Sequence, residues 1–293
     1  MSILVGIGAE VEQYLPSLVL KHSILKHVSQ EVDFIILDQA VHQSRFKPEL
    51  ENHTGRTPFS LQRFLLAEQL ISSKCEIGVY LDSDMLVFDD IAELCVEFEN
   101  LNEPIATVSV DPVWKRKAQS SVLIMNREGA EVLLNRFQSF LLDLMSYDEL
   151  MYFENIHGWS AINCAWNCLE YYDENTKLIH FTDMDTQPWL KSTNKFCGIW
   201  EIALLNALSS DEVHQEFLKS LEKGFIRPSL QELNSMPYRH YTGLKPLLAD
   251  YLWIPPHRYK RIKNHKIRTL IAPLYHVVWI TKMIKNGGLL NRV

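Results

Sequence analysis

The chain contains the stretch Val79-Tyr80-Leu81-Asp82-Ser83-Asp84-Met85-Leu86-Val87-Phe88, in which two carboxylates one residue apart interrupt an apolar run. Residues i and i+2 of a strand point to the same side, so Asp82 and Asp84 are expected to converge beyond the end of a buried strand. Two carboxylates there suit a hard cation, Mg²⁺ or Mn²⁺, that carries a phosphate-bearing substrate. The alternative is a turn after a strand, where Asp and Ser are common. The flanking sequence has to decide between these interpretations.

Length and composition indicate a globular chain. Its 293 residues fit one large domain, or one domain with a substantial appendage. No apolar run reaches the length of a membrane span, and residues 1–8 lack the basic region of a signal peptide and are predicted as a first strand. The five cysteines are odd in number and form no Cys-x-x-Cys pair, which favours reduced thiols in a cytoplasmic protein.

Charge is unevenly distributed along the chain. The formal net charge is −7, yet no acidic residue follows Asp250, and residues 251–293 carry nine Lys and Arg. This basic tail predicts an anionic partner surface. Aromatic residues such as Trp253 and Trp279 lie among the basic ones, which favours the inner face of a membrane over nucleic acid. The alternative is a C-terminal helix that packs on the body and exposes a solvated basic face.

Hydrophobic periodicity predicts an α/β fold. A strand over 2–8, a helix over 13–28 and a strand over 32–37 form the opening of a parallel sheet. Residues 39–59 are predicted as a loop. The further elements expected are a helix over 60–71, a strand over 77–82, a helix capped by Asp89 or Asp90 and ending near 98, strands over 105–110 and 121–126, a helix over 128–145 and a strand over 177–182. We expect a catalytic domain over residues 1–200 and a mixed or helical part over 201–293.

Two further segments accompany the aspartates and carry a resemblance. Thr57-Pro58-Phe59-Ser60-Leu61-Gln62-Arg63-Phe64 precedes them, and Leu178-Ile179-His180-Phe181-Thr182-Asp183-Met184-Asp185-Thr186-Gln187-Pro188-Trp189 follows far downstream. Together these segments resemble the core of glycosyltransferase family 8, over roughly residues 3 to 190. The resemblance implies a GT-A fold, which is a Rossmann-like mixed sheet with flanking helices, here followed by a helical, basic C-terminal extension. It also implies transfer of a hexosyl group from a UDP-sugar with retention of configuration, with Mn²⁺ or Mg²⁺ as cofactor and a glycan or glycolipid as acceptor.

The resemblance assigns a metal site. Asp82 and Asp84 would bridge the metal to the diphosphate, and His180 would be the third ligand, whose imidazole nitrogen suits Mn²⁺ better than Mg²⁺. His240, in His240-Tyr241-Thr242-Gly243-Leu244-Lys245-Pro246, echoes the same motif and is the alternative third ligand. Arg63 would lie near the diphosphate and the sugar, and its alternative role is a salt bridge to Asp84.

Other positions match the family less closely. The nucleotide-sugar contacts that the resemblance implies, besides Arg63, are Gly6, Ile7, Gly8, Tyr14, Ser83, Asp111 and Gln187. The residues implied near the reacting sugar are Gln119, Asp148 and Glu149. Gln187 stands where the family has Lys, and Glu149 stands where it has Gln, so the diphosphate and sugar contacts depart from the family pattern.

Two alternatives stay open on the sequence. A phosphohydrolase of the haloacid dehalogenase type also carries strand–Asp-x-Asp, but it requires Thr or Val where this chain has Leu86, and its motif normally lies near the N-terminus. A non-catalytic protein that binds a nucleotide sugar or glycan at a membrane surface is the other alternative, which the altered positions Gln187 and Ser121 keep open.

Overall fold

The computed structural model describes residues 1–38, 58–108 and 119–235, together with residues 250 and 252–254 and a few positions between 267 and 277. The chain divides into two compact units, Met1–Met184 and Asp185–Val293. The assignment of catalysis to residues 1–200 stays a prediction.

The first unit opens with the predicted strand, helix and strand, which are β1 (Ile3–Gly8), α1 (Tyr14–His27) and β2 (Val32–Ile36). Every residue of β1 is buried, as its uninterrupted apolar sequence suggests for a central strand covered on both faces. β1 pairs in parallel with β2 on one side and with β3 (Ile77–Asp82) on the other.

The main sheet is mixed and has the strand order β2-β1-β3-β6-β5-β7. β6 (Gln119–Asn126) runs antiparallel to β3 and also to β5 (Ile105–Val108), so β3 and β5 run in the same direction. β7 (Trp159–Ile162) extends the sheet parallel to β5. This architecture confirms the predicted α/β class with a mixed sheet and flanking helices.

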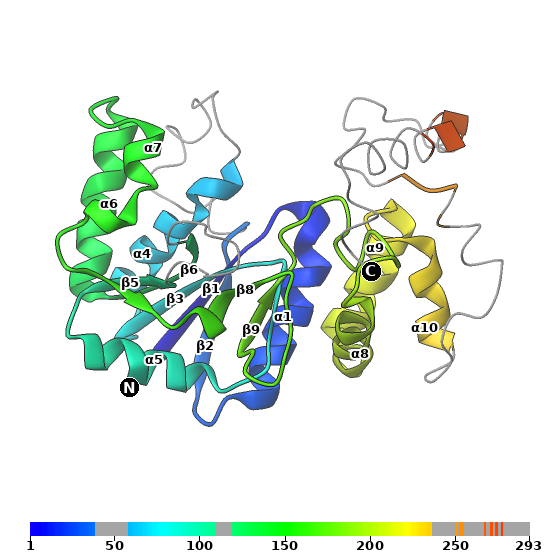
Figure 1. The fold of residues 1–293 in the computed structure, drawn as a ribbon, viewed down its shortest axis with the longest axis horizontal. Coiled ribbons are helices and arrows are strands. Elements are labelled where there is room, and N and C mark those ends of the chain that lie inside the picture. Colours follow the sequence, from blue (N-terminus) through cyan, green and yellow to red (C-terminus); the bar gives the residue numbers. More distant parts are fainter. Residues whose placement is uncertain are drawn as a thin grey trace. The chain divides into compact units, whose positions relative to one another are not determined.

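Helices cover both faces of this sheet (Figure 1). On one face α4 (Gln62–Ser72) and α6 (Arg127–Leu141) bury an apolar cluster that includes Phe64 and Phe137, whose ring centroids are 5.0 Å apart. On the other face α1 and α5 (Ile91–Leu101) cover a second cluster. Tyr80 belongs to the first cluster, whereas its neighbours Val79 and Leu81 belong to the second, as the alternation of a strand requires.

A second, three-stranded sheet has the order β4-β9-β8 and consists of β4 (Met85–Val87), β9 (Leu178–His180) and β8 (Cys168–Leu169). β4 and β9 are antiparallel, with Met85 opposite His180. The backbone N–H of Phe181 also donates to the carbonyl of Asp84 at 2.8 Å. This pairing brings the late strand directly to the aspartates.

The element boundaries agree with the sequence where capping residues mark them. The Asp90 side chain accepts from the Ala92 N–H at 2.9 Å and caps α5, and Asn102 ends that helix in the left-handed conformation. The helix predicted to reach residue 145 ends at Leu141, because the chain turns through Asp143 with φ of 55°. The strand–Asp-Ser-Asp–strand pattern over 77–88 matches β3 and β4, whereas the sequence analysis did not predict β7, β8 or the short helix α7 (Tyr147–Leu150). The described residues also contain five short 3-10 helices: η1 (Val11–Gln13), η2 (Pro58–Leu61), η3 (Phe153–Asn155), η4 (Cys164–Asn167) and η5 (Pro228–Leu230).

The described part of the second unit is helical, with α8 (Cys197–Ala207), α9 (Asp211–Lys223) and α10 (Gln231–Ser235). Arg227 is fully buried there, donates through Nε to the Pro188 carbonyl at 2.9 Å and forms an ion pair with Glu201. Among the described residues, no helix combines the length and the apolar composition that a bilayer crossing needs. Most of the basic tail lies outside the described residues, so its predicted membrane contact stays a prediction.

The close packing of α6 at Gly129 can be tested, with Gly198 of α8 as the control. A Cβ on Gly129 would lie 2.0 Å from the carbonyl oxygen of Pro104, which is backbone and cannot move aside, whereas a Cβ on Gly198 of α8 meets no heavy atom within 4 Å. We expect Gly129→Ala to lower the free energy of unfolding by about 2 kcal/mol. Gly198→Ala, the control, should leave it unchanged or raise it by about 0.5–1 kcal/mol. Urea unfolding followed by circular dichroism measures both, and an unaltered midpoint for Gly129→Ala would contradict this packing.

Candidate active site

Asp82, Asp84 and His180 form the one cluster of three potential metal ligands found among the described residues. Each offers one ligand atom, and these atoms lie within 4.8 Å of one another. Asp82 ends β3, Asp84 lies in the bend before β4, and His180 ends β9, with Nε2 3.0 Å from Asp84 Oδ1. Two carboxylates and one imidazole are a donor set that fits a first-row divalent cation such as Mn²⁺.

Two carboxylates lie close together in this buried cluster, and Arg63 and His180 are the positive groups that act on Asp82. Burial raises the pKa of the Asp82 carboxyl; Arg63 and His180 oppose this, and the carboxylate of Asp84 adds to it. Burial lowers the pKa of the His180 imidazole, but Asp84 and Asp82 outweigh this, so the pKa lies above its usual value. A bound divalent cation would offset the repulsion between the two carboxylates, and the residues present fit a metal.

The Asp82 carboxylate is held from the side of α4. The Tyr80 hydroxyl donates to Asp82 Oδ1 at 2.7 Å, and burial raises the pKa of this phenol, which keeps it a donor. The Arg63 guanidinium lies 4.0 Å from the same oxygen, over the Tyr80 ring, and donates to the Ser120 hydroxyl. The salt bridge considered for Arg63 is thus made to Asp82 instead of Asp84.

A second chain of contacts orients His180. Its Nδ1 lies 3.0 Å from Asn167 Oδ1, and Asn167 Nδ2 donates to the Ser121 hydroxyl at 3.1 Å. An amide oxygen can only accept, so Nδ1 carries the hydrogen and Nε2 is the nitrogen directed at Asp84 and able to bind a metal. Asn167 is buried, and the sequence analysis missed this role for it, although the aromatic–Asn pair Trp166-Asn167 precedes β9.

The ends of β1 and β3 are tied together beside the cluster. The Ser83 N–H donates to the Gly8 carbonyl at 3.0 Å, and the Gln62 amide donates to the Ala9 carbonyl at 2.9 Å. A Cβ on Gly8 would lie 2.3 Å from the Tyr80 hydroxyl oxygen, so only glycine lets Tyr80 reach Asp82. The structure thus brings Gly8 and Ser83 together next to the aspartates, while the nucleotide contacts predicted for them stay predictions.

Four other residues with predicted nucleotide or diphosphate contacts belong to described elements. Gly6 and Ile7 belong to the buried β1, and Tyr14 begins α1. Gln187 is buried in the second unit. Their predicted roles toward the nucleotide and the diphosphate are untested and stay predictions.

Asp148 and Glu149 lie on α7. The Glu149 carboxylate accepts from the backbone N–H of Ser146 at 2.8 Å and completes the capping box of this helix. Glu149 therefore has a structural role, and a role near the sugar stays a prediction for both residues. The side chain of Gln119 and the residues Asp111, His240 and Lys245 lie outside the described residues.

No family model and no curated protein matches this chain. Solved structures do match. The galactosyltransferase LgtC, in complex with donor and acceptor sugar analogs, is 18% identical with a TM-score of 0.51, over 75% of this chain and 100% of LgtC. The chain has the GT-A fold.

Two further GT-A matches agree. The bifunctional glycosyltransferase WbbM is 13% identical with a TM-score of 0.51, over 73% of this chain and 51% of WbbM. The glycosyltransferase GlyE of Streptococcus pneumoniae TIGR4 is 14% identical with a TM-score of 0.50, over 74% of this chain and 63% of GlyE. The match thus spans about half of WbbM, under two thirds of GlyE and all of LgtC. At these identities the likeness establishes the GT-A fold alone.

The contact between Asn167 and His180 predicts a loss of metal affinity. We expect Asn167→Ala to weaken Mn²⁺ binding by about 10–100-fold, because the imidazole loses the acceptor that fixes its tautomer. Asn167→Asp keeps an acceptor and should retain most of the affinity. Isothermal titration with Mn²⁺ alone measures both, and Asn135→Ala, an exposed asparagine on α6, is the control. Equal affinities for Asn167→Ala and the control would refute the positioning role.

Proposed function

We propose that this protein is a metal-dependent glycosyltransferase that moves a hexosyl group from a UDP-sugar to a glycan or glycolipid acceptor with retention of configuration. The observation that carries the proposal is the convergence of Asp82, Asp84 and His180 at the carboxyl end of β3 in a GT-A fold. In open α/β sheets, ligands bind outside the carboxyl ends of the strands. The resemblance to glycosyltransferase family 8 supports the donor class and the stereochemistry.

Asp82, Asp84 and His180 would hold Mn²⁺, with Mg²⁺ as the alternative. When bound, the cation supplies positive charge to the diphosphate of the donor. The protein prepares this site through Tyr80 and Asn167, which fix the directions of the Asp82 carboxylate and the His180 imidazole.

In the proposed reaction, the bond between the anomeric carbon and the diphosphate oxygen breaks, and a bond from the acceptor oxygen to that carbon forms on the same face. The acceptor proton passes to the leaving diphosphate, and UDP is released. Negative charge grows on the diphosphate as the sugar becomes oxocarbenium-like. We assign the stabilisation of that charge to Arg63, whose buried guanidinium is already oriented by Ser120 and Tyr80.

The partners follow from the same proposal. The acceptor would be a surface polysaccharide or glycolipid in synthesis. The basic and aromatic residues of the 251–293 tail would hold the enzyme on the inner face of an anionic membrane, in a cytoplasmic location. Nucleic acid is not among the proposed partners.

A non-catalytic protein that binds a nucleotide sugar or glycan is the second candidate. The replacement of the family Lys by Gln187 favours it, because a diphosphate contact is weakened. The GT-A fold leaves the haloacid dehalogenase-like alternative without support, since that alternative rested on the Asp-x-Asp pattern alone.

Donor hydrolysis tests the proposed activity. With Mn²⁺ and a panel of UDP-sugars, we expect slow UDP release with at least one donor, abolished by EDTA and restored by added Mn²⁺. Asp82→Asn and Asp84→Asn should lower this rate by at least about 100-fold, because the ligand charge is lost. Asp143→Asn, in the exposed turn after α6, is the control. NMR of the released sugar reports the anomer.

The outcomes of this assay separate the candidates. If no nucleotide sugar is bound or hydrolysed, the transferase proposal is refuted. Tight UDP-sugar binding with Mn²⁺ but no UDP release, with or without acceptors, would favour the binding protein.

Arg63 should affect turnover more than metal binding. Arg63→Lys keeps a positive charge but loses the planar fork that lies over Tyr80 and reaches Ser120. We expect UDP release to fall by about 100-fold while the Mn²⁺ affinity stays within a few-fold of wild type. The control is Arg127→Lys, since Arg127 donates to the backbone carbonyls of Ile71 and Ser73, at the other end of α4. Near-normal turnover in Arg63→Lys would remove the assigned role.

A further inference from the structure

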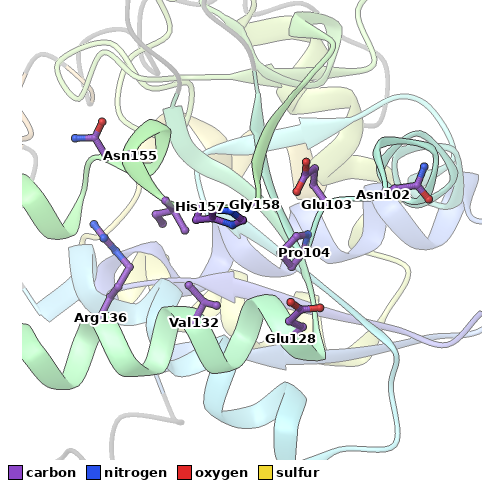
Figure 2. A pocket seen from close by; sticks show the side chains of 10 residues that line it. Asn102, Glu103, Pro104, Glu128, Val132, Arg136, Asn155, His157 and Gly158 are labelled. Atoms are coloured by element: carbon purple, nitrogen blue, oxygen red, sulfur yellow. The ribbon is translucent and has the colours of Figure 1, made fainter.

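A groove of about 480 Å³ lies in the first unit (Figure 2). One wall is a single face of α6, formed by Glu128, Val132 and Arg136 at intervals of four residues. The other walls are two loops, Asn102–Pro104 and Asn155–Gly158. Its volume is within the range of ligand sites, roughly 300–1,000 Å³.

The groove lies at one end of the parallel strands of the main sheet, and the cluster of Asp82, Asp84 and His180 lies at the other end. The loops that form the groove directly precede β5 and β7, which are parallel to each other. β3 runs in the same direction as β5, because both are antiparallel to β6, and Asp82 is at the end of β3. The groove therefore lies at the amino ends of these strands, and the metal cluster lies beyond the carboxyl end.

The walls of the groove are fixed by backbone contacts. Gly158 has φ of 79°, and a Cβ there would lie 2.8 Å from Pro104 Cγ. Its carbonyl accepts from the Ile105 N–H at 3.3 Å, and the Pro104 carbonyl accepts from the Asn126 N–H at 3.1 Å. The site is thus formed before any ligand binds, which reduces the cost of ordering it.

Several polar side chains of the groove are available to a ligand, and Arg136 keeps further donors besides the nitrogen that donates to the Glu149 carbonyl at 2.6 Å. Among the described residues, the side chains of Glu103, Glu128, Asn155 and His157 have neither a hydrogen-bond nor an ion-pair partner. Glu128 and Arg136 are eight residues apart, about 12 Å along the helix. Figure 2 shows Arg136 at one end of the groove and the two glutamates toward the other. One end therefore offers acceptors and the other offers donors.

We propose that this groove binds a segment of a neutral oligosaccharide. Sugar hydroxyls both donate and accept, so one chain can satisfy the carboxylates at one end and the guanidinium at the other. Pro104, Val132 and Ile156 supply apolar surface for the C–H faces of the rings. Two carboxylates repel a phosphate, which argues against a second nucleotide-sugar site.

This inference rests on the proposed transferase function for its biological meaning. A segment bound at the amino ends of the strands cannot be the sugar that reacts at their carboxyl ends. It is therefore a remote part of the acceptor or of the growing product. Holding such a segment raises the effective concentration of the acceptor end at the site.

Binding is tested by NMR on the ¹⁵N-labelled protein without Mn²⁺ or UDP-sugar, so the result does not depend on catalysis. The probes are tetrasaccharides of glucose, galactose and N-acetylglucosamine, and the zwitterionic peptide Lys-Ala-Ala-Asp. We expect at least one tetrasaccharide to shift the amides of Asn102, His157 and Gly158. Glu128→Ala should weaken that binding by about tenfold, whereas Glu131→Ala, exposed on the same helix, should not.

Shifts in these groove amides that Glu128→Ala weakens support the assignment. No binding by any tetrasaccharide, shifts confined to the surroundings of Asp82, or equal binding by both glutamate variants would overturn it. Binding of the peptide alone would overturn it too and would assign the groove to a peptide. Circular dichroism confirms that both variants are folded. A positive result with no UDP release in the donor assay would retain the groove and reject the transferase.

Discussion

The antiparallel pairing of β4 with β9 is the constraint on which the candidate active site depends. Its register sets Met85 opposite His180 and joins the Phe181 N–H to the Asp84 carbonyl at 2.8 Å. Side chains alternate along a strand, so a slip of one residue would turn the imidazole to the other face and present an apolar side chain to the aspartates. Both strands are three residues long, and the surrounding core has to hold that register.

The carboxylates of the candidate site are buried, and burial disfavours their charged form. Asp82 is 8% exposed and His180 is 5% exposed, and two carboxylates share this poorly solvated position. Arg63 and Tyr80 supply part of the compensation through one oxygen of Asp82, and the raised pKa of that carboxyl shows that the compensation is incomplete. Shifted pKa values of this kind are common at functional sites, and a bound cation would offset the charge of the two carboxylates. The chemistry therefore accounts for a local feature that packing does not.

Much of the fold follows from local sequence. The apolar runs of β1 and β3, the helix cap at Asp90 and the i, i+2 spacing of the aspartates predict their elements and the direction of the two carboxylates. The short strands β7 and β8 carry too few residues for a periodic signal, and only pairing with distant partners creates them. For the same reason, the approach of His180 was available only through the resemblance. From the sequence, Tyr80 is one more buried strand residue, and only the structure shows that Gly8 leaves room for its hydroxyl. The groove along α6 combines three segments that no local sequence pattern connects.

The apolar clusters and the cluster of potential metal ligands place different demands on the sequence. This difference is compatible with a GT-A fold at 18% identity to LgtC. The two apolar clusters need only the right alternation of buried residues, which many sequences provide. The cluster of Asp82, Asp84 and His180 is stricter, because two of its members are oriented by other side chains: Asp82 by Tyr80 of the same strand and by Arg63 of α4, and His180 by Asn167 of the turn before β8. An orienting side chain that lies on a separate element cannot be replaced by a neighbour of the ligand. The candidate site therefore depends on a few supporting contacts spread along the chain, whereas most buried positions of the sheet depend on apolar character and on alternation.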